Sequence, residues 1–403
     1  MELKHPHSHL SYCTNIHPGE SWKEVFAQLK THIPPLKTRL SPQHPFGIGL
    51  RLSNKAAKEL RRPRKIAAFK QWLDAQRAYV FTINGFPYEN FHGEIVKDRV
   101  YEPDWSSPER LDYTLMLTEL LAKLVPGGLD GGISTSPISY KPWIKGTSQR
   151  KNILRKASRQ LSEVALRMAE IEATQGTELH IDIEPEPDCL IENTQETISF
   201  FKDWLLPIGT RHMKKNAGHS SSKAESLLLR HVRVCYDTCH FAVEYESPRD
   251  TIAQFKEAGI RIGKVQISAA LKAPLTSAAQ RSALRERLLP FKEDVYLHQV
   301  KAKDRDGSLS AYPDLPAALP HIEKEQAVEW RIHYHVPIFM KTFGTLSSTQ
   351  DAIIESLDIF NAEPELCNHF EIETYTWAVL PQTLKRNVID SIEREFQWVL
   401  DVF

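Results

Sequence analysis

The sequence predicts an α/β protein whose parallel sheet closes into a (β/α)8 barrel. Strand-like and helix-like segments alternate along nearly the whole chain of 403 residues, a pattern typical of a parallel sheet. In the segment 232–240, VRVCYDTCH, a β-prone run gives way to Asp237 and His240. Strands buried on both faces have such runs, and α/β folds carry their chemistry at the carboxyl ends of the strands. We therefore expect polar side chains at the other strand ends as well.

Nine segments have the composition of strands. They are 10–16, 46–53, 78–84, 133–138, 178–187, 232–235, 263–268, 330–339 and 370–377. A barrel of this class needs one strand fewer, so we expect 330–339 to be an insertion or a strand-end loop. A polar insertion is expected at 208–225 and an inserted hairpin at 294–315, all within one domain that spans 1–403.

Helices are expected between these strands, from the spacing of apolar residues and from capping signals. Ser21 is expected to cap the first helix, and Asn54 to cap a basic helix that follows the second strand. Asn193, with Glu196 three residues later, predicts another helix start. The other expected helices are 107–124, 149–173, 248–258, 277–288 and 382–402. The basic helix after the second strand has two explanations for its run of lysines and arginines. The run forms either a solvated outer face or a binding surface for an anionic partner.

Composition and charge exclude several classes of function. Lysine plus arginine and aspartate plus glutamate each number 51, so the formal net charge is zero, which argues against nucleic-acid binding by bulk charge. No apolar run approaches the ~20 residues needed to span a membrane, and the N-terminus has no apolar signal segment. Five cysteines, an odd number, fit a reducing compartment. We expect a cytoplasmic protein, with Cys235 and Cys239 as buried thiols rather than zinc ligands.

The strand ends carry side chains that suit a metal ion. By alternation, the segment 178–187 places four ionisable side chains on one face, namely His180, Asp182, Glu184 and Glu186. The full set at the strand ends is Glu184, Asp237, His240, Gln266 and Glu373, with Glu186, His335 and Glu371 in reserve. Carboxylate and amide oxygens suit Mn²⁺ or Mg²⁺, and an imidazole shifts the preference toward Mn²⁺, Co²⁺ or Zn²⁺. The alternative is that the acids fill a polar barrel mouth with salt bridges.

These residues also suggest a reaction. A divalent cation at the strand ends would bind two neighbouring oxygens of a ketose and stabilise the enediolate that forms when the adjacent proton is removed. Two carboxylates on opposite walls would take and return that proton. The loop 85–93 is rich in aromatic residues such as Phe86, Tyr88 and Phe91, which suit stacking on a ring or a sugar face. Packing within the loop explains these aromatics equally well.

Several motifs spread over nearly the whole chain carry a family resemblance. They are LSYCTNIHPGESW at 10–22, NGFPY at 84–88, DIEPEP at 182–187, YDTCH at 236–240, HVP at 335–337 and ETYTW at 373–377. The order Glu, Asp-x-x-His, His or Gln, Glu at successive strand ends resembles the xylose isomerase-like barrel superfamily. That superfamily includes sugar and sugar-phosphate isomerases and epimerases and the type IV apurinic endonucleases. More narrowly, the motifs resemble the EboE family, the metabolite traffic proteins of bacterial Ebo clusters.

The resemblance implies a TIM barrel with a metal site at its carboxyl-end mouth. The superfamily's metal ligands map to Glu184, Asp237, Gln266 and Glu373, and its acid/base pair maps to the two glutamates. Gln266 stands where many members have a histidine, which implies a more oxygen-rich site with weaker metal affinity. Asn84 and Ser136 stand where the endonucleases have histidines of their metal cluster, which argues against a role in DNA repair.

Two functions follow from the resemblance. The first is a metal-dependent sugar or sugar-phosphate isomerase or epimerase of an Ebo-type pathway for metabolite biosynthesis or export. The second is a non-catalytic protein that binds and hands over a lipid-like or aromatic precursor. In both, the expected partners are a small metabolite and other Ebo-cluster proteins, without nucleic acid or membrane insertion. The residues expected to contact the substrate are Asn84, Phe86, Tyr88 and His17.

Overall fold

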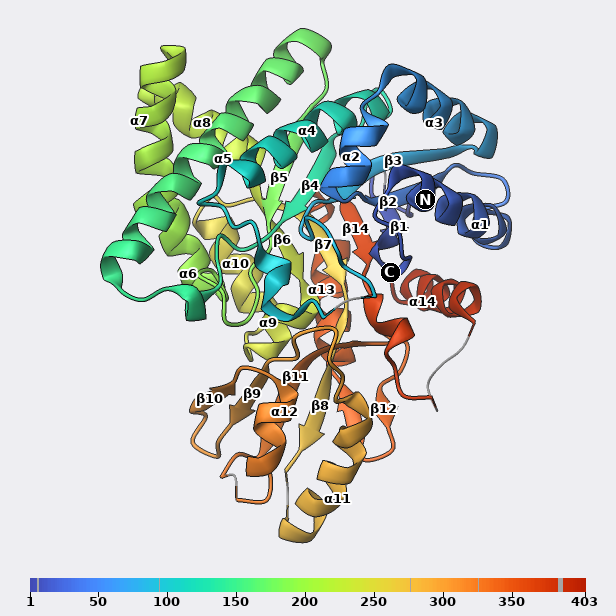
Figure 1. The fold of residues 1–403 in the computed structure, drawn as a ribbon, viewed down its shortest axis with the longest axis vertical. Helices are drawn as coiled ribbons and strands as arrows, with labels where there is room; N and C mark the ends of the chain where they lie inside the picture. Colours follow the sequence, from blue (N-terminus) through green and yellow to red (C-terminus); the bar gives the residue numbers. More distant parts are fainter. Residues whose placement is uncertain (6, 94, 276, 325, 383–386) are drawn as a thin grey trace.

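A parallel barrel forms the larger part of the molecule (Figure 1). The computed structural model describes residues 1–403 except 6, 94, 276, 325 and 383–386. In this part of the chain, the barrel strands are β1 (His9–Tyr12), β2 (Phe46–Arg51), β3 (Ala78–Asn84), β4 (Gly131–Thr135), β5 (Leu179–Ile183), β6 (Val232–Asp237), β7 (Ile262–Ile267) and β14 (His369–Ile372). They pair in chain order from β2 to β7, then with β14 and β1. A parallel bridge between Cys13 and Gly49 brings the β1 and β2 ends together. The predicted α/β barrel is confirmed.

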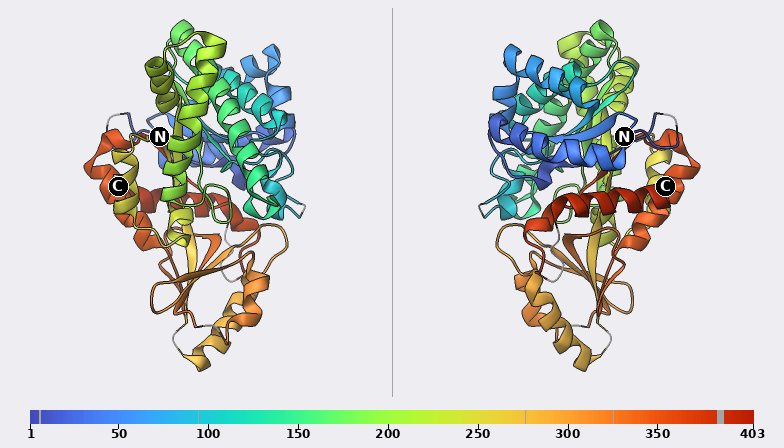
Figure 2. Two further views of the ribbon diagram at one scale, coloured as in Figure 1. Left: turned by 90° about the vertical axis from the view of Figure 1, so that its left-hand side faces the viewer. Right: turned by 90° about the vertical axis from the view of Figure 1, so that its right-hand side faces the viewer.

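Helices surround the barrel on its outer side (Figures 1 and 2). They are α1 (Trp22–Leu40), α2 (Asn54–Leu60), α3 (Pro63–Gln76), α4 (Pro108–Leu124), α5 (Thr147–Gln175), α6 (Thr194–Ser199), α7 (Leu206–Ala217), α8 (Ser221–His231), α10 (Pro248–Glu257), α13 (Gln350–Ala362) and α14 (Val388–Val402). The predicted Ser21 cap forms a capping box with Glu24, and Asn193 caps α6 through the Glu196 N–H. Within the described residues, no helix combines the length and the apolar character needed to cross a membrane.

Three helical predictions are corrected by the structure. The basic helix is divided into α2 and α3 at Pro63, because proline lacks the N–H that would continue the helix, and Ser53 caps α2 in place of Asn54. The polar insertion predicted at 208–225 is mostly helical and consists of α7 and the start of α8, in which Met213 and Ala224 are buried. The last helix begins at Val388, and part of its predicted start lies outside the described residues.

A second, antiparallel sheet is inserted between β7 and β14. Its strands are β8 (Ala269–Pro274), β9 (Val300–Lys303), β10 (Leu309–Tyr312), β11 (Glu329–Val336), β12 (Thr342–Phe343) and β13 (Leu346–Ser348), in the spatial order β10-β9-β11-β8-β13-β12. The views in Figure 2 show it beyond one end of the barrel, together with α11 (Ala278–Leu288) and α12 (Leu315–Ala318). Because β7 continues into β8 after the single residue Ser268, this is the end at which the barrel strands have their carboxyl termini.

The surplus one of the nine predicted strands belongs to the inserted sheet and not to the barrel. The segment expected at 330–339 is β11, which pairs with β8 and β9 rather than with a barrel strand. The hairpin expected within 294–315 is formed by β9 and β10. The insertion is nevertheless larger than predicted, because β8 follows β7 without a turn signal and reads as a continuation of the same strand.

The barrel interior contains buried charge as well as apolar side chains. Lys264 of β7 and Glu371 of β14 form an ion pair of 2.6 Å with both side chains fully buried. In β5, His180 Nδ1 lies 2.6 Å from Asp182 Oδ1. Two glycines make room for these side chains, because a Cβ on Gly49 would lie 1.7 Å from Glu371 Oε1 and one on Gly263 would lie 1.9 Å from Asp182 Oδ1.

Candidate metal centre at the barrel mouth

Three buried carboxylates meet where barrel strands end. Asp237 is the last residue of β6, and Glu184 and Glu373 directly follow β5 and β14. One oxygen from each lies within 4.8 Å of the others. Glu184 Oε2 and Asp237 Oδ2 are buried without a hydrogen-bond partner, although buried polar atoms in folded proteins are nearly always partnered. Converging, unpartnered carboxylate oxygens are the donors that a divalent cation requires.

Burial and mutual repulsion shape the protonation of this cluster. Burial, followed by the negative charges of Glu373 and Asp237, raises the pKa of Glu184 well above its usual value. Burial, followed by the charge of Asp237, likewise raises the pKa of Glu373. Desolvation and neighbouring like charge both disfavour the ionised carboxyl. A cation among the three oxygens would reverse both effects.

The orientation of Asp237 is fixed by the start of the next helix. Asp237 is the N-cap of α9 (Thr238–Val243), and its Oδ1 accepts hydrogen bonds from the N–H groups of Cys239 and His240 at 2.8 and 3.1 Å. The same oxygen accepts from Ser268 Oγ at 2.6 Å. With Oδ1 saturated, Oδ2, which is buried without a hydrogen-bond partner, is the oxygen left for a ligand. The short polar run after the strand thus serves both as a helix start and as a ligand holder.

Two amides orient Glu373. Its Oε1 accepts hydrogen bonds from Asn15 Nδ2 at 2.8 Å and Asn84 Nδ2 at 3.0 Å. Asn15 follows β1, and Asn84 ends β3. Since both amides donate to the same oxygen, the other carboxylate oxygen is left for a ligand.

A pocket opens above the carboxylates. One part of its wall is aromatic and is formed by Phe86, Phe91, Tyr101, Tyr296 and Tyr375. The other part is polar and is formed by Asn15, Asn84, Glu184, Glu186, His240, His333 and Glu373. Such a combination of an apolar wall and a few convergent polar groups is typical of small-molecule sites.

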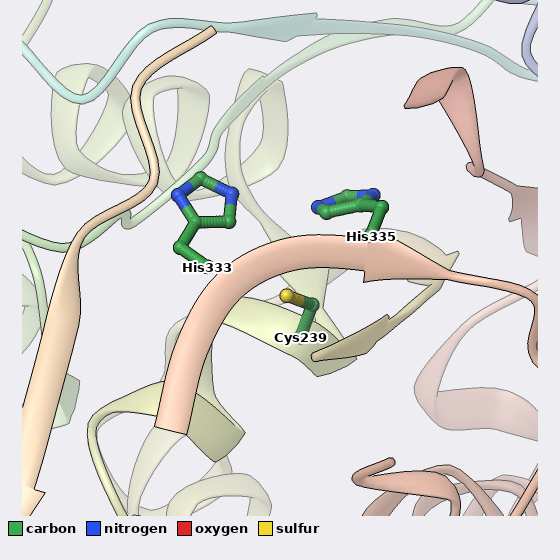
Figure 3. A group of neighbouring side chains, drawn as sticks. All are labelled: Cys239, His333 and His335. Carbon is green, nitrogen blue, oxygen red and sulfur yellow. The ribbon is translucent and has the colours of Figure 1, made fainter. Parts of the chain in front are cut away.

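The inserted sheet contributes histidines to this mouth. In Figure 3, the rings of His333 and His335 project from β11, with Cys239 of α9 opposite them. One ligand atom from each of these three residues lies within 4.8 Å of the others. Burial lowers the pKa of His333 and His335 and raises that of the Cys239 thiol, so the two rings favour the neutral form and the thiol keeps its proton.

The structure brings together most, but not all, of the residues expected at the site. Gln266 lies inside the barrel, where its Oε1 accepts from Cys235 Sγ at 2.7 Å and its Nε2 has no partner. In the opposite amide orientation, its oxygen would take the unpartnered position. Glu371 is engaged deeper in the barrel by Lys264. Glu371 was predicted as a possible additional metal ligand, and its ion pair with Lys264 disfavours that role.

The residues expected to contact a substrate fall into two groups. Asn84 and Phe86 line the pocket above the carboxylates. Tyr88 lines a different pocket and packs edge-on against Tyr113. His17 is stacked on His32, and its Nε2 is hydrogen-bonded to Tyr12 Oη at 2.9 Å. It is not among the residues that line the pocket above the carboxylates.

Asn15 and Tyr296 line the pocket although no prediction assigned them to the site. Asn15 follows a barrel strand, so the rule that singled out Asp237 would also have found it. Tyr101, which was expected together with the aromatic loop to stack on a ring or a sugar face, and Tyr296, which was not expected there, both lie outside the strands. Only the folded chain brings them to the mouth.

Comparison with known proteins agrees with the barrel. No protein-family model matches the sequence, and no curated protein matches it. Among solved structures, the chain is similar to a xylose isomerase-like TIM barrel protein from Mycobacterium smegmatis in complex with magnesium, with a TM-score of 0.50 and 11% identity over 100% of this chain and 98% of that one. The fold is a xylose isomerase-like TIM barrel.

Two other structures have lower scores. The IOLI protein with a bound zinc atom has a TM-score of 0.48 and 11% identity, with 98% of this chain and 97% of that chain covered. The probable 3-DHS dehydratase AsbF of Bacillus anthracis has a TM-score of 0.44 and 11% identity, with 97% and 98% covered.

Proposed function

We propose that this protein is a metal-dependent isomerase or epimerase that acts on a sugar-like polyol or keto compound at the barrel mouth. The observation that carries the proposal is the cluster of Glu184, Asp237 and Glu373, whose buried oxygens converge beneath a pocket. The magnesium in the Mycobacterium smegmatis structure and the zinc in the IOLI structure belong to those proteins, and they support a divalent cation here.

The carboxylates would hold the cation and move the proton. Their oxygens, with the oxygen of Gln266 in its opposite amide orientation, would form a donor set suited to Mn²⁺ or Mg²⁺, with Co²⁺ or Zn²⁺ as alternatives. Such an ion supplies polarisation of the substrate carbonyl and charge stabilisation of the oxygen next to the reacting carbon. Glu184 and Glu373 would take and return the proton at the reacting carbon.

Other groups would position the substrate. The Asn15 and Asn84 amides fix the Glu373 carboxylate, and their location in the pocket wall lets them also meet substrate hydroxyls. The aromatic wall around Phe86 and Tyr101 suits the apolar face of a sugar. We further propose that the protein belongs to the EboE family and serves an Ebo-type pathway in the cytoplasm, with a small metabolite and other Ebo-cluster proteins as partners, which the motifs at the strand ends support.

The experiment compares Glu184→Gln and Glu373→Gln with the wild type. Each protein is incubated with Mn²⁺ and a panel of ketoses, ketose phosphates and polyol phosphates in deuterated water, and exchange and isomerisation at carbon are followed by NMR. Loss of one acid/base group should reduce turnover by about 10²–10⁴-fold. Glu109→Gln on the exposed start of α4 is the matched control and should leave the rate unchanged.

Two results would redirect the proposal. Full activity in both glutamine variants would exclude their role as the acid/base pair. Absence of turnover across the panel, together with a metabolite that copurifies and is lost from a Phe86→Ala variant, would favour the second function of binding and hand-over without chemistry.

A further inference from the structure

The three histidines at the mouth are all held in the same tautomer. His240 Nδ1 lies 2.9 Å from the Pro185 carbonyl oxygen, and His335 Nδ1 lies 2.7 Å from the Glu373 carbonyl oxygen. A carbonyl oxygen only accepts hydrogen bonds, so in both rings Nδ1 must carry the proton. The Nε2 atom of a neutral ring with this tautomer has a lone pair and no hydrogen.

His333 has this tautomer for a less direct reason. Its Nδ1 lies 2.8 Å from Gln299 Oε1. The amide of Gln299 is oriented by its other end, because Gln299 Nε2 donates to the Pro187 carbonyl oxygen at 3.1 Å and to Tyr101 Oη at 3.2 Å. The opposite orientation would bring two acceptor oxygens together at Pro187. Gln299 Oε1 therefore faces His333 as an acceptor, and His333 Nδ1 donates to it.

The resulting Nε2 lone pairs converge. The Nε2 atoms of His240 and His333 are 3.1 Å apart, and in these tautomers neither has a hydrogen to place between them. His335 Nε2 is buried without a partner. Two donors of a tetrahedral zinc ion, with bonds of 2.0–2.1 Å, are about 3.3 Å apart. The distance between the two Nε2 atoms therefore matches that between two ligands of one metal ion.

Glu186 supplies an anionic donor at the same place. A ligand atom of Glu186 lies within 4.8 Å of those of His240 and His333. Its Oε1 accepts from Tyr101 Oη at 2.8 Å, whereas Oε2 is buried and unpartnered. A second group with mutual distances within 4.8 Å joins Asp237, His240 and His335, so His335 and the Asp237 carboxylate border the same space.

We propose that His240, His333 and Glu186, with His335 alongside, hold a second divalent ion next to the one held by Glu184, Asp237 and Glu373. The Pro185 and Glu373 carbonyls and the Gln299 amide act as the outer partners that fix ring orientation in metal sites. The proposal rests on the proposed function, because it makes the mouth a two-metal centre in which Asp237 lies between the two ligand sets.

The two sites should differ in metal preference. The first set offers only oxygen donors, which suit Mg²⁺ and Mn²⁺, whereas the second offers imidazoles, which suit Zn²⁺ and Co²⁺. Because His333 and His335 belong to β11, the inserted sheet supplies half of the second site. A barrel without this insertion would retain the first site alone.

The test is the number of Co²⁺ ions bound per chain. Chelator-treated full-length protein is titrated with Co²⁺, followed by visible absorption and by elemental analysis after desalting. The wild type should bind about two ions, His333→Ala/His335→Ala about one, and Glu184→Gln/Glu373→Gln about one. Excess Mg²⁺ should displace Co²⁺ from the first site and leave the absorption of the histidine site. His321→Ala, an exposed histidine of the same insertion, is the matched control and should bind as the wild type does.

The outcomes separate this inference from the proposed function. One Co²⁺ in the wild type that survives His333→Ala/His335→Ala and is lost from Glu184→Gln/Glu373→Gln would overturn the second site and leave the proposed function intact. Absence of Co²⁺ binding would overturn both. If the double histidine variant fails to fold, the wild-type titration still decides, because saturation at a single equivalent contradicts the second site.

Discussion

Two layers of carboxylates in this barrel differ in what faces them. In the deeper layer, Glu371 is paired with Lys264 at 2.6 Å and Asp182 with His180 at the same distance. At the mouth, among the described residues, Glu184, Asp237 and Glu373 form no ion pair with a lysine or arginine, and their nearest basic partner is His240 at 3.8 Å or more. Buried acids thus have a partner within the chain where the barrel is packed and are left for a ligand where the pocket opens.

The electrostatics of the two layers follow from this difference. Desolvation would lower the pKa of Lys264, but the charge of Glu371, the neighbouring thiols and the hydrogen bond to Glu371 together raise it, so the Lys264 ammonium stays ionised. At the mouth, burial and neighbouring carboxylates act in the same direction and raise the pKa of Glu184. A site that binds a cation needs such uncompensated negative charge, and it accepts a cost in stability for it.

The largest expected effect comes from breaking the deep pair. Lys264→Met leaves the Glu371 carboxylate buried without a counter-ion, and we expect the free energy of unfolding to fall by about 3–5 kcal/mol. Urea denaturation at neutral pH measures this change. The double variant Lys264→Met/Glu371→Leu should recover most of the loss, since removal of both charges leaves none uncompensated. A single variant as stable as the wild type would contradict the assigned role of the pair.

A smaller effect separates the two tasks of Asp237. Asp237→Ala removes the acceptor for three hydrogen bonds at the start of α9 and should cost about 2 kcal/mol of stability. Asp237→Asn keeps an acceptor oxygen there and should cost about half as much. Both should weaken Mn²⁺ binding, measured by calorimetry beside thermal unfolding. If the asparagine variant bound Mn²⁺ as tightly as the wild type, Asp237 would be a cap and not a ligand.

The smallest effect is a pH dependence of the chelator-treated protein. The pKa of Glu184 is raised in the folded state above its ordinary value of 4.5, so the folded chain holds a proton that the unfolded chain has released. Stability from this group is complete below about pH 4.5 and is lost as the pH rises toward the raised value. Glu184→Gln should therefore lose less stability than the wild type as the pH rises from 5 to 7.

The measurement is the free energy of unfolding across this pH range, with and without Mn²⁺. Saturating Mn²⁺ should flatten or invert the wild-type slope, because a bound cation favours the ionised carboxylate. Equal slopes in the wild type and in Glu184→Gln would show that Glu184 is not the group responsible.

The sequence determined the barrel strands and the faces they present. Strand alternation placed Glu184 and Asp237 toward the interior, and their position after β-prone runs placed them at the carboxyl ends, as the structure shows. The caps at Ser21 and Asn193 were also predictable, because a capping motif depends on residues within one turn. These signals are local, and each depends on a few neighbouring residues.

Only the tertiary structure decided how deep each carboxylate lies in the barrel and which side chain it pairs with. Glu371 and Glu373 share a face of β14 and its extension, yet the first meets Lys264 and the second lies at the mouth, because alternation fixes the face of a strand but not its register against its neighbours. Likewise, His333 and His335 reach the barrel mouth because β11 pairs with β8, some sixty residues earlier in the chain. Pairings over such distances depend on the packing of the whole chain, so the second set of ligands becomes visible only in the folded protein.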